Sequence, residues 1–569
     1  MYNINPFYGQ ENLQSISFSA GHIDAPYAQI MTVDSGGGIP RINFGDGFAS
    51  ATTVFGNQTL DTGHWFQNGQ TANTVTINVA RLEKIKEWQY AVTGINDGII
   101  GDLDLSNFKG LWGNVFITGH KHLTGITFPS EMSTTQEFLI FRAFSCDIQG
   151  HIELSGMTNI GRTSPNSTSF QMYGNNGITS VNFPITEKLV DYSFRSCGLN
   201  EVDLSMVSGY TGFDFSNNPT LSSITFTMSG HVNTITGSLN LYQCAFKEID
   251  FTPLGDKFGG KINFYENPYL TAVTFPTTTA NVTEFQCQSC GFVEESILDL
   301  RPIQNLKTYI VIRNNSYGEL YFPSNDNLIT TFVTRNLNKI KTLDLSPLSG
   351  ISTSYNFSFC SLLTGVTFPT GNLYEITGVN FSGCDLKELD MTNIPQLSTI
   401  ILSHTNSDLT AVTFPNSAYY IEDFDFYNCD LREVDFTPLS SYGGDLNFYS
   451  NPNLSAITFS PTNETITSVI SYGCDLGFVN FRPLSAGTQD GITINLDNNS
   501  TTFTECNQIL DSLSGMGAQN GTLYLSGSSA SPTGAEGYDT SSGGINGFTI
   551  YEDLINNSGW TIFMSGLTV

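Results

Sequence analysis

The stretch "FDFYNCDLREVDFTPL" (Phe424–Leu439) decides the fold, because close copies of it recur along the chain. Upstream, the copies read "FSGCDLKELDMTNI" (Phe381–Ile394) and "LYQCAFKEIDFTPL" (Leu241–Leu254). Segments of the "VDF" type begin at intervals of 45 to 49 residues between Val202 and Val479. A second series, of the "ITF" type, ends roughly midway between them. The repeating unit is therefore a rung of about 22 to 25 residues.

Each rung contains a short strand followed by a turn. One type follows F-x-F-x-x-C-x-L-x-x-V-D-F-T-P-L, and the other follows L-x-F-x-x-N-P-x-L-x-x-I-T-F (Leu446–Phe459). Both fit L-x-L-x-x-N/C-x-L, in which alternate apolar residues point into a solenoid and the residue between them points outward. Aromatic residues fill most inward positions, so the 42 Phe predict a stacked aromatic core. We expect a mainly β, leucine-rich-repeat solenoid of about seventeen rungs.

The N/C position of the pattern predicts a structural ladder. The chain turns there, so a small inward side chain has to satisfy backbone groups that the next rung does not reach. Successive cysteines of this series lie two rungs apart, beyond the reach of a disulfide, so we expect reduced thiols. The ladder residues are Cys197, Cys244, Cys384, Cys429 and Cys474 in one rung type and Asn218, Asn267, Asn406 and Asn451, with Asn175, in the other; Asn338 and Cys360 are the exceptions.

The outward strand position carries short amides and acids on many rungs, with Tyr265, Tyr427 and Tyr449 at the strand ends beside them. Amides with aromatic neighbours suit carbohydrate or protein ligands. An amide ladder that only solvates and stiffens a sheet fits the pattern equally well. The candidate ligand-binding residues are Gln171, Asp214, Asn240, Asn263, Gln286, Asn356, Asn380, Asp425 and Asn447.

The composition excludes several classes of function. A net charge of −30, from 52 acidic and 22 basic residues, argues against nucleic acid as a partner and against an anionic membrane. No apolar run is long enough to span a bilayer, so membrane insertion is not expected. The opening "MYNINPFYGQENLQS" lacks the features of a signal peptide, which favours synthesis in a cytoplasm or release from one by lysis.

Residues with catalytic or metal-binding chemistry are scattered. The seven histidines do not cluster, and His120 falls in a ladder position. The "CQSC" motif (Cys287–Cys290) has no second pair, which disfavours zinc or redox chemistry. Acids such as Glu388 with Asp390 recur through periodicity, which indicates a solvated face rather than a general-acid pair. We expect neither an enzyme nor a cofactor or metal.

Three parts of the chain resemble known families. The segments "CSLLTGVTFP" (Cys360–Pro369) and "NSDLTAVTFP" (Asn406–Pro415) make the rungs similar to BspA-like (Treponema-type) leucine-rich repeats. "INFGDG" (Ile42–Gly47), followed by a T-V-T-I strand, weakly resembles a β-sandwich of the polycystic-kidney-disease (PKD) type, with Phe44 in place of the usual Trp. The order of "NGTLYLSG" and "GWTI" around two short helices looks like the end of many phage tail and virion proteins.

These features predict three regions. Residues 1–95 form a β-sandwich-like attachment module, residues 96–497 form the solenoid, and residues 498–569 form a C-terminal α/β capping module, with a helix over 503–517 covering the last rung.

The resemblances imply a non-enzymatic protein of a virion surface, acting as a fibre, a decoration or a receptor-binding component. Its partners would be other virion proteins through the N-terminal module and a host surface glycan or protein through the solenoid. A homo-oligomer is compatible with this role. The alternative is a bacterial cell-surface adhesin of the BspA-like kind.

Overall fold

The computed structural model describes the backbone of strands between residues 14 and 91 and, with gaps, residues 99–564, the longest gap being 528–546. The chain divides into two compact units, unit 1 (Met1–Gly291) and unit 2 (Phe292–Val569). Both units are solenoids of parallel strands, and the mainly β leucine-rich-repeat fold predicted from the sequence is confirmed.

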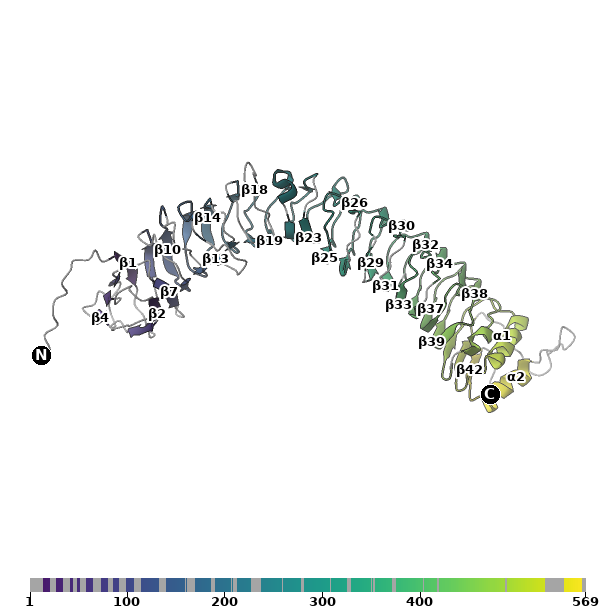
Figure 1. Cartoon of the computed structure of the whole chain (residues 1–569). Helices are drawn as coiled ribbons and strands as arrows, with labels where there is room; N and C mark the ends of the chain where they lie inside the picture. The colour runs from purple at the N-terminus through teal and green to yellow at the C-terminus, as the bar shows by residue number, and fades with distance from the viewer. Residues whose placement is uncertain are drawn as a thin grey trace, which may run out of the picture. The chain divides into compact units, whose positions relative to one another are not determined.

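In unit 1, each rung carries one strand in a front sheet and, after the turn, one strand on the back (Figure 1). Neighbouring strands pair in parallel, as Phe170 with Tyr192 and Val202 with Ile224. The front strands are β9 (Asn114–Thr118), β11 (Ile140–Arg142), β13 (Ser169–Gln171), β15 (Asp191–Ser193), β17 (Gly212–Asp214), β19 (Ser238–Asn240), β21 (Gly259–Asn263) and β23 (Asn281–Gln286). The back strands are β10 (His122–Thr127), β12 (Gln149–Glu153), β14 (Gly177–Asn182), β16 (Glu201–Asp203), β18 (Ser223–Thr225), β20 (Glu248–Asp250) and β22 (Ala272–Thr274), with a 3-10 helix, η2 (Thr252–Lys257), after β20.

The N-terminal strands of unit 1 extend both of its sheets. The front sheet continues in the order β9-β7-β2-β5, and the back sheet in the order β10-β8-β1-β6-β3-β4. β7 still pairs in parallel with β9, whereas β1 to β6 pair antiparallel among themselves. The PKD-type resemblance stays a prediction, and the "FGDG" turn with Asp46 lies outside the described residues. The strands are β1 (Gln14–Ala20), β2 (Tyr27–Val33), β3 (Arg41–Asn43), β4 (Ala49–Ala51), β5 (Gln58–His64), β6 (Asn73–Val79), β7 (Ile85–Ala91) and β8 (Ile99–Asp104).

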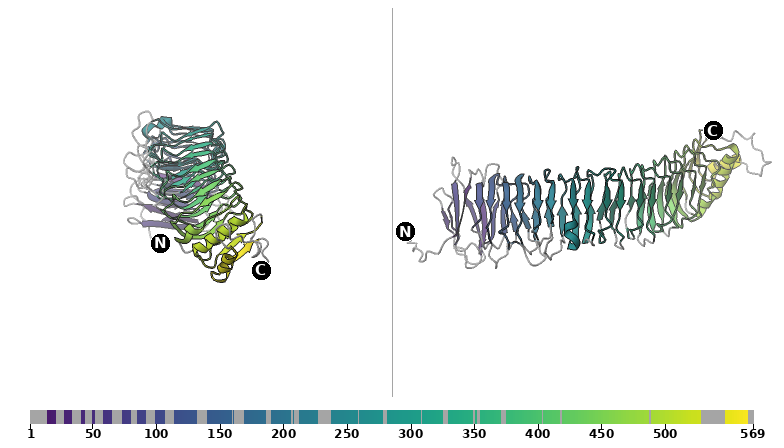
Figure 2. Two further views of the ribbon diagram at one scale, coloured as in Figure 1. Left: turned by 90° about the vertical axis from the view of Figure 1, so that its right-hand side faces the viewer. Right: turned by 90° about the horizontal axis from the view of Figure 1, so that it is seen from above.

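Unit 2 repeats the same rung, and its front strands lie side by side in chain order (Figure 2). They are β25 (Tyr309–Val311), β27 (Thr331–Val333), β29 (Tyr355–Asn356), β31 (Ile376–Asn380), β33 (Leu397–Leu402), β35 (Ile421–Asp425), β37 (Tyr442–Asn447), β39 (Asn463–Ile470), β40 (Thr493–Asn495), β41 (Thr522–Leu525) and β42 (Thr561–Met564). The back strands are β24 (Ile297–Asp299), β26 (Glu319–Tyr321), β28 (Thr342–Asp344), β30 (Gly365–Thr367), β32 (Glu388–Asp390), β34 (Ala411–Thr413), β36 (Glu433–Asp435) and β38 (Ala456–Thr458).

The last rungs of unit 2 replace the back strand by a helix. A 3-10 helix, η3 (Arg482–Ala486), follows β39, and the α-helices α1 (Phe503–Met516) and α2 (Gly547–Asn556) follow β40 and β41. The solenoid as a whole has about 14 turns. The sequence predicted about seventeen rungs.

Stacked rings fill the core of each unit. Phe357 and Phe381 lie 5.5 Å apart with their planes 15° from parallel, and Phe426 and Phe448 lie 6.1 Å apart at 3°. All four side chains are fully buried. Because identical positions of successive rungs hold an aromatic residue, the parallel register places each ring on the next, where burial and ring contacts both stabilise the solenoid.

The asparagines of the ladder hold the turn that follows each front strand. The Nδ2 of Asn451 donates to the carbonyl oxygens of Phe426 in the preceding rung, at 2.9 Å, and Phe448 in its own rung, at 2.8 Å. Its Oδ1 accepts from the N–H of Leu431 in the preceding rung at 3.1 Å. Asn218 makes the same three kinds of contact, with Phe194, Phe215 and Leu199. Asn267 and Asn406 likewise donate back to the preceding rung.

The cysteines make only half of these contacts. The Sγ of Cys474 donates to Phe448 O at 3.2 Å, and Cys197, Cys244 and Cys384 donate in the same way to Met172, Phe215 and Phe357. Cys429 donates to Tyr427 O. All ten cysteines are free thiols, and burial raises the pKa of Cys197, Cys244 and Cys429 to about 12 and that of Cys474 to about 11.

A difference in the turns explains why asparagine and cysteine alternate. In a C-x-L rung the leucine follows the ladder residue by two positions, and its N–H points inward to the amide oxygen of the next rung, as Leu431 does to Asn451. In an N-P-x-L rung the leucine follows by three positions, and its N–H bonds to the ladder residue's own carbonyl, as Leu454 does to Asn451 O. The next rung then needs only a donor, which a thiol supplies.

One ladder assignment from the sequence is wrong. Asn338 does not occupy the ladder position of its rung; the fully buried Leu337 does, and Asn338 is exposed. The marker is the residue before the ladder position, which has a positive φ throughout, such as Asn428 (53°), Ser450 (58°) and Asn336 (58°). The N–H of Leu337 donates to the sulfur of Cys360 at 3.4 Å, so a cysteine in the next rung takes over the acceptor role of asparagine.

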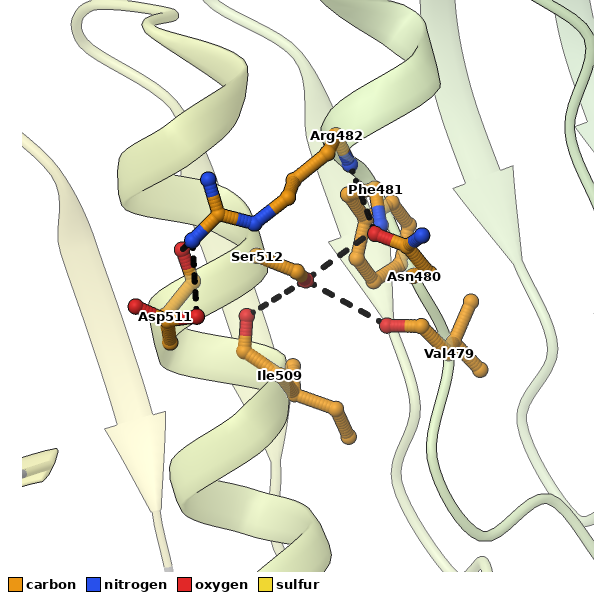
Figure 3. A network of polar contacts seen from close by, with 7 residues as sticks. All are labelled: Val479, Asn480, Phe481, Arg482, Ile509, Asp511 and Ser512. Atoms are coloured by element: carbon orange, nitrogen blue, oxygen red, sulfur yellow. Dashed lines mark hydrogen bonds and ion pairs between the residues drawn. The ribbon is translucent and has the colours of Figure 1, made fainter. Parts of the chain in front are cut away.

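The helix predicted over 503–517 is present as α1, which takes the place of a back strand after β40; the sheet continues beyond it through β41 and β42, and a capping role stays a prediction. Ile509, Leu510 and Leu513 are fully buried, and Thr502 and Glu505 form a capping box at its start. Polar contacts fix the helix to the preceding rung (Figure 3). The Oγ of Ser512 accepts from Phe481 N at 3.3 Å, and its single proton faces the carbonyl oxygens of Ile509 at 2.7 Å and Val479 at 3.3 Å. None of the helices that the structure describes is long and apolar enough to span a bilayer.

Beside Ser512, Arg482 contacts the exposed side of the same helix. Its Nη2 donates to the Oδ2 of Asp511 at 2.7 Å and to the Asp511 carbonyl at 3.2 Å. A Cβ at Gly515 would lie 2.1 Å from the guanidinium, so a larger residue there would require the arginine side chain to move. The sheet then continues in parallel through β40, β41 and β42.

Substitution of Asn451 by leucine should lower the free energy of unfolding by about 2 to 4 kcal/mol, because the N–H of Leu431 and two carbonyls lose their partner. The matched change Cys474→Ser should cost clearly less, because a hydroxyl still donates to Phe448 O. Urea unfolding followed by circular dichroism measures both. Equal losses in the two variants would contradict the division of roles between asparagine and cysteine.

Ser512→Val should destabilise the C-terminal end by about 1 to 3 kcal/mol, because it leaves Val479 O and Phe481 N without a partner. Ser514→Val on the exposed side of α1 is the control, since it carries the same loss of helix propensity. Hydrogen exchange at Ile492–Leu496 reports the effect. Unchanged protection there in Ser512→Val would show that α1 does not stabilise the last rungs.

Candidate functional site

The outward polar residues of unit 1 form one continuous row on the front sheet. Gln171, Asp214, Asn240, Asn263 and Gln286 each end a front strand, and all are half-buried. The register places Gln171 beside Ser193, Ser193 beside Asp214, and then Asn240, Asn263 and Gln286 in order. The structure therefore brings all five together on one face, with a serine inserted between the first two.

In unit 2 the corresponding row is interrupted. Asn356 pairs with Asn380, but Leu402 follows before Asp425 and Asn447. Beyond Asn447, the register position is held by Ile470. The four predicted residues thus form two pairs on one sheet, separated by the apolar Leu402. The prediction from the sequence did not include this interruption.

Many polar atoms of these rows are used within the fold. The Oδ1 of Asp214 accepts from Ser216, from both its N–H at 3.1 Å and its hydroxyl at 2.5 Å. Asn356 and Asn380 accept in the same way from the N–H two residues later, at 3.2 and 3.0 Å. The Nδ2 of Asn447 donates to Asp425 Oδ1 at 3.0 Å. Such contacts are Asx turns and amide ladders, so stiffening of the sheet is one role of the row.

The acids on the back strands have the same role. Asp250 and Asp435 each accept from the backbone N–H two residues later, at 2.8 and 2.9 Å, and Asp390 does so at 2.9 Å. Sequence reasoning assigned these acids to a solvated face and missed their part in the turns. The signal for it was the threonine that follows each of these three acids by two positions.

The front face of unit 1 holds a hollow of about 610 Å³. Two predicted residues, Gln171 and Asp214, line it; the other six were missed, and of these Tyr173 and Arg195 have long polar side chains. Both of these residues lie two positions after an outward strand residue, so the rung pattern could have located them. The lining consists of Ser145, Gln171, Tyr173, Gly174, Ser193, Arg195, Ser196 and Asp214. Hydroxyls, an amide and one charge of each sign converge there, which suits a polar, hydrogen-bonding ligand.

A row of aromatic rings runs beside the polar row, at the start of the turn. His404 stacks on Tyr427 at 4.4 Å and Tyr427 on Tyr449 at 4.8 Å, with planes within 6° of parallel. In unit 1, Tyr242 and Tyr265 stack at 4.5 Å. Because the ring faces contact each other, these residues offer ring edges and hydroxyls to a ligand rather than a flat stacking surface.

Cys287 and Cys290 lie close to each other, with their sulfurs 3.6 Å apart. Cys290 also donates to Phe264 O at 3.2 Å, which is the ladder contact of its rung. Among the described residues, no group of three or more Cys, His, Asp or Glu side chains could hold a metal ion.

Comparisons with known proteins point to one family. The model of the "BspA type leucine rich repeat region" matches six copies, over residues 166–294, 303–405 and 402–486, together more than half of the chain. No curated protein matches the chain. Among solved structures, the functional domain of InlJ from Listeria monocytogenes, described as including a cysteine ladder, is similar at 14% identity, over 63% of this chain and 71% of that one, with a TM-score of 0.29. The Toll–Spatzle complex of Drosophila, in its glycosylated form, is similar at 12% identity, over 72% and 77%, with a TM-score of 0.24.

The substitution Asp425→Asn should make the protein more stable at neutral pH. Burial raises the pKa of the Asp425 carboxyl, against the opposing effects of His404, the Tyr427 N–H and Asn447. A carboxyl with a raised pKa binds its proton more tightly when folded, so its ionised form costs stability, and that cost disappears as the pH falls below the unfolded value of about 3.9.

The difference in unfolding temperature between Asp425→Asn and the unmodified chain should therefore be positive at pH 7 and shrink towards pH 4. Asp435→Asn on the exposed back strand is the control. A stability difference that does not change with pH would mean that the Asp425 charge is not responsible.

Proposed function

Because the chain belongs to the BspA-type leucine-rich-repeat family, we propose that it is a non-enzymatic binding protein that recognises a surface glycan or protein through the front face of its rungs. Leucine-rich-repeat solenoids of this type are surface-binding or adhesion scaffolds. The observation that carries the proposal is the hollow over β13 to β17, where side chains from successive rungs converge. Weak contacts from many rungs add along an extended ligand.

More specifically, we propose that the chain is a phage virion component: a fibre, a decoration or a receptor-binding protein. Its residues 1–95 would attach it to other virion proteins. This proposal is supported by the N-terminal strands, whose antiparallel pairing departs from the repeating rung, and by the α/β end of the chain. An irregular end offers a unique docking surface, whereas the rungs suit a repetitive ligand. The alternative is a bacterial cell-surface adhesin, which the family itself favours.

The two locations are distinguished by labelling with antibodies against the full chain. Gold particles seen by electron microscopy on virions, and absent from uninfected host cells, would support the virion role. Labelling of intact cells without phage would support the adhesin instead. Capsid and tail genes beside the coding sequence would point the same way as labelled virions.

Binding through the front face is tested with the fluorescently labelled full chain and host cells. The double substitution Gln171→Ala with Arg195→Ala in the hollow should reduce cell binding about tenfold or more, because two polar contacts are lost. The matched control Gln149→Ala with Lys247→Ala changes exposed residues on the back of the same unit. Equal binding by both double variants would exclude the hollow, and absence of binding by the unmodified chain would argue for a purely structural role.

A further inference from the structure

Two arginines on adjacent rungs of unit 2 have no acidic partner among the residues that the structure describes. Arg313 follows β25 and Arg335 follows β27, two residues after Val311 and Val333, which are paired in register. The N–H of Asn314 donates to Arg335 O at 3.2 Å, which fixes the two turns side by side. The two side chains therefore start from backbone positions about 4.8 Å apart, which is the spacing of neighbouring strands.

Neither arginine forms an ion pair with any residue that the structure describes, whereas Arg301 and Arg482 do. The Nε of Arg313 is buried and has no hydrogen-bond partner in the described part of the chain. Two like charges on neighbouring rungs repel each other, and an unsatisfied buried donor is costly. The chain has 52 acidic residues against 22 basic ones, yet no described acidic residue forms an ion pair with either arginine. An oxyanion placed between the guanidinium groups would relieve both costs.

An exposed aromatic ring lies one rung further along the same edge. Phe359 is 61% exposed and has a φ of 61°. It holds the turn position that Asn314 and Asn336 hold on the preceding rungs, and the chain of contacts continues from Asn336 N to Ser358 O and from Phe359 N to Ser382 O. Positive φ suits asparagine or glycine, whereas a bulky residue there is a genuine outlier. The repeat imposes a positive φ on this turn position, and Phe359 is the one aromatic residue that holds it in the described rungs.

The surroundings of Phe359 leave its ring available to a ligand. A Cβ at Gly383, the next residue of the edge, would lie 3.0 Å from Cδ1 of Phe359, so the ring lies against the space that this glycine leaves open. Unlike the stacked rings of His404, Tyr427 and Tyr449, it has no ring stacked on it among the described residues. A phenylalanine face of this kind packs on the apolar face of a sugar ring.

We infer that Arg313, Arg335 and Phe359 form a binding site for an acidic saccharide. The two guanidinium groups hold a carboxylate or sulfate, and the phenyl ring packs against the neighbouring sugar. Asn314 and Asn336 add amides, which are already joined to each other at 3.0 Å, for the sugar hydroxyls. The net charge of −30 disfavours a densely charged nucleic acid, whereas a saccharide with isolated acidic groups needs only a local pair of cations. This site rests on the proposed binding function and specifies its ligand class.

Isothermal titration of the full chain tests the site with four probes: a galacturonate tetrasaccharide, a sulfated galactan tetrasaccharide, a neutral galactan tetrasaccharide and inorganic polyphosphate. At least one of the two acidic saccharides should bind, the neutral one at least tenfold more weakly, and added salt should weaken the acidic complex. The carboxylated and sulfated probes distinguish the two sources of the oxyanion. Failure of both acidic saccharides to bind, or equal binding of the neutral one, would overturn the proposal.

Two variants assign the binding to these residues. Arg313→Gln with Arg335→Gln should weaken binding of the acidic saccharide about tenfold or more, whereas Lys387→Gln with Arg432→Gln, which removes two exposed positive charges elsewhere in unit 2, should not. Phe359→Asn should also weaken binding, while the unfolding temperature stays the same or rises, because asparagine tolerates a positive φ. A Phe359→Asn variant that binds normally would overturn the saccharide assignment, as would polyphosphate that binds as tightly as the acidic saccharide.

Failure of this site and failure of the proposed function give different results. If the acidic probes do not bind while host cells still capture the labelled chain, the saccharide site is wrong and the binding role stands. If the probes bind through Arg313 and Arg335 but cells do not capture the chain, the site stands and the proposed surface is wrong.

Discussion

The turn after each front strand is the constraint on which the structure depends. At that point the chain leaves the sheet and its backbone donors and acceptors face the interior, where an unsatisfied group is expensive. Each rung solves the problem with one side chain that reaches back to the rung before it, as Asn451 reaches Phe426 and Leu431. No rung satisfies its own turn completely, so stability is shared between neighbours. In unit 2 the helix α1 takes the place of a back strand, and its buried residues share the core of the rungs beside it.

The alternation of two rung types follows from the same constraint. In a rung that ends in C-x-L, one inward backbone N–H has no partner within the rung, and an amide oxygen of the next rung accepts from it. In a rung with N-P-x-L every such N–H is bonded within the rung, so the next rung needs only the weak donor of a thiol. The repeat of about 45 residues is therefore the true chemical period, although the structural rung is half as long. The rung of Leu337 shows the limit of the rule, because there the sulfur of Cys360 acts as the acceptor.

The sequence was sufficient to predict the features that recur. Period 2 within a strand and the fixed offset to the turn identified the inward aromatic residues and the ladder series, because both are repeated. The amphipathic pattern identified the helix over 503–517. The misplacement of Asn338 had a local cause: its rung has an apolar residue in the ladder, and only the backbone conformation of Asn336 reveals the register. The Asx turns of the back strands were missed because a solvated acid and a turn-forming acid have the same pattern. The convergence of Tyr173 and Arg195 with Gln171 depends on how strands of different rungs align, which a single rung does not show.

Departures from the repeat carry more information about binding than the repeat does. Inward positions are fixed by packing, ladder positions by the buried turn, and many outward amides by their own Asx turns, so a conforming residue at any of these has a sufficient structural explanation. Arg313, Arg335 and Phe359 lack such an explanation: the two arginines form no ion pair with a described residue, and Phe359 is the one aromatic residue that holds the positive-φ turn position in the described rungs. A costly residue at a position where inexpensive ones also fit is retained for what it contacts outside the fold. In a protein built from near-identical rungs, the binding surface is therefore to be sought where the rungs differ.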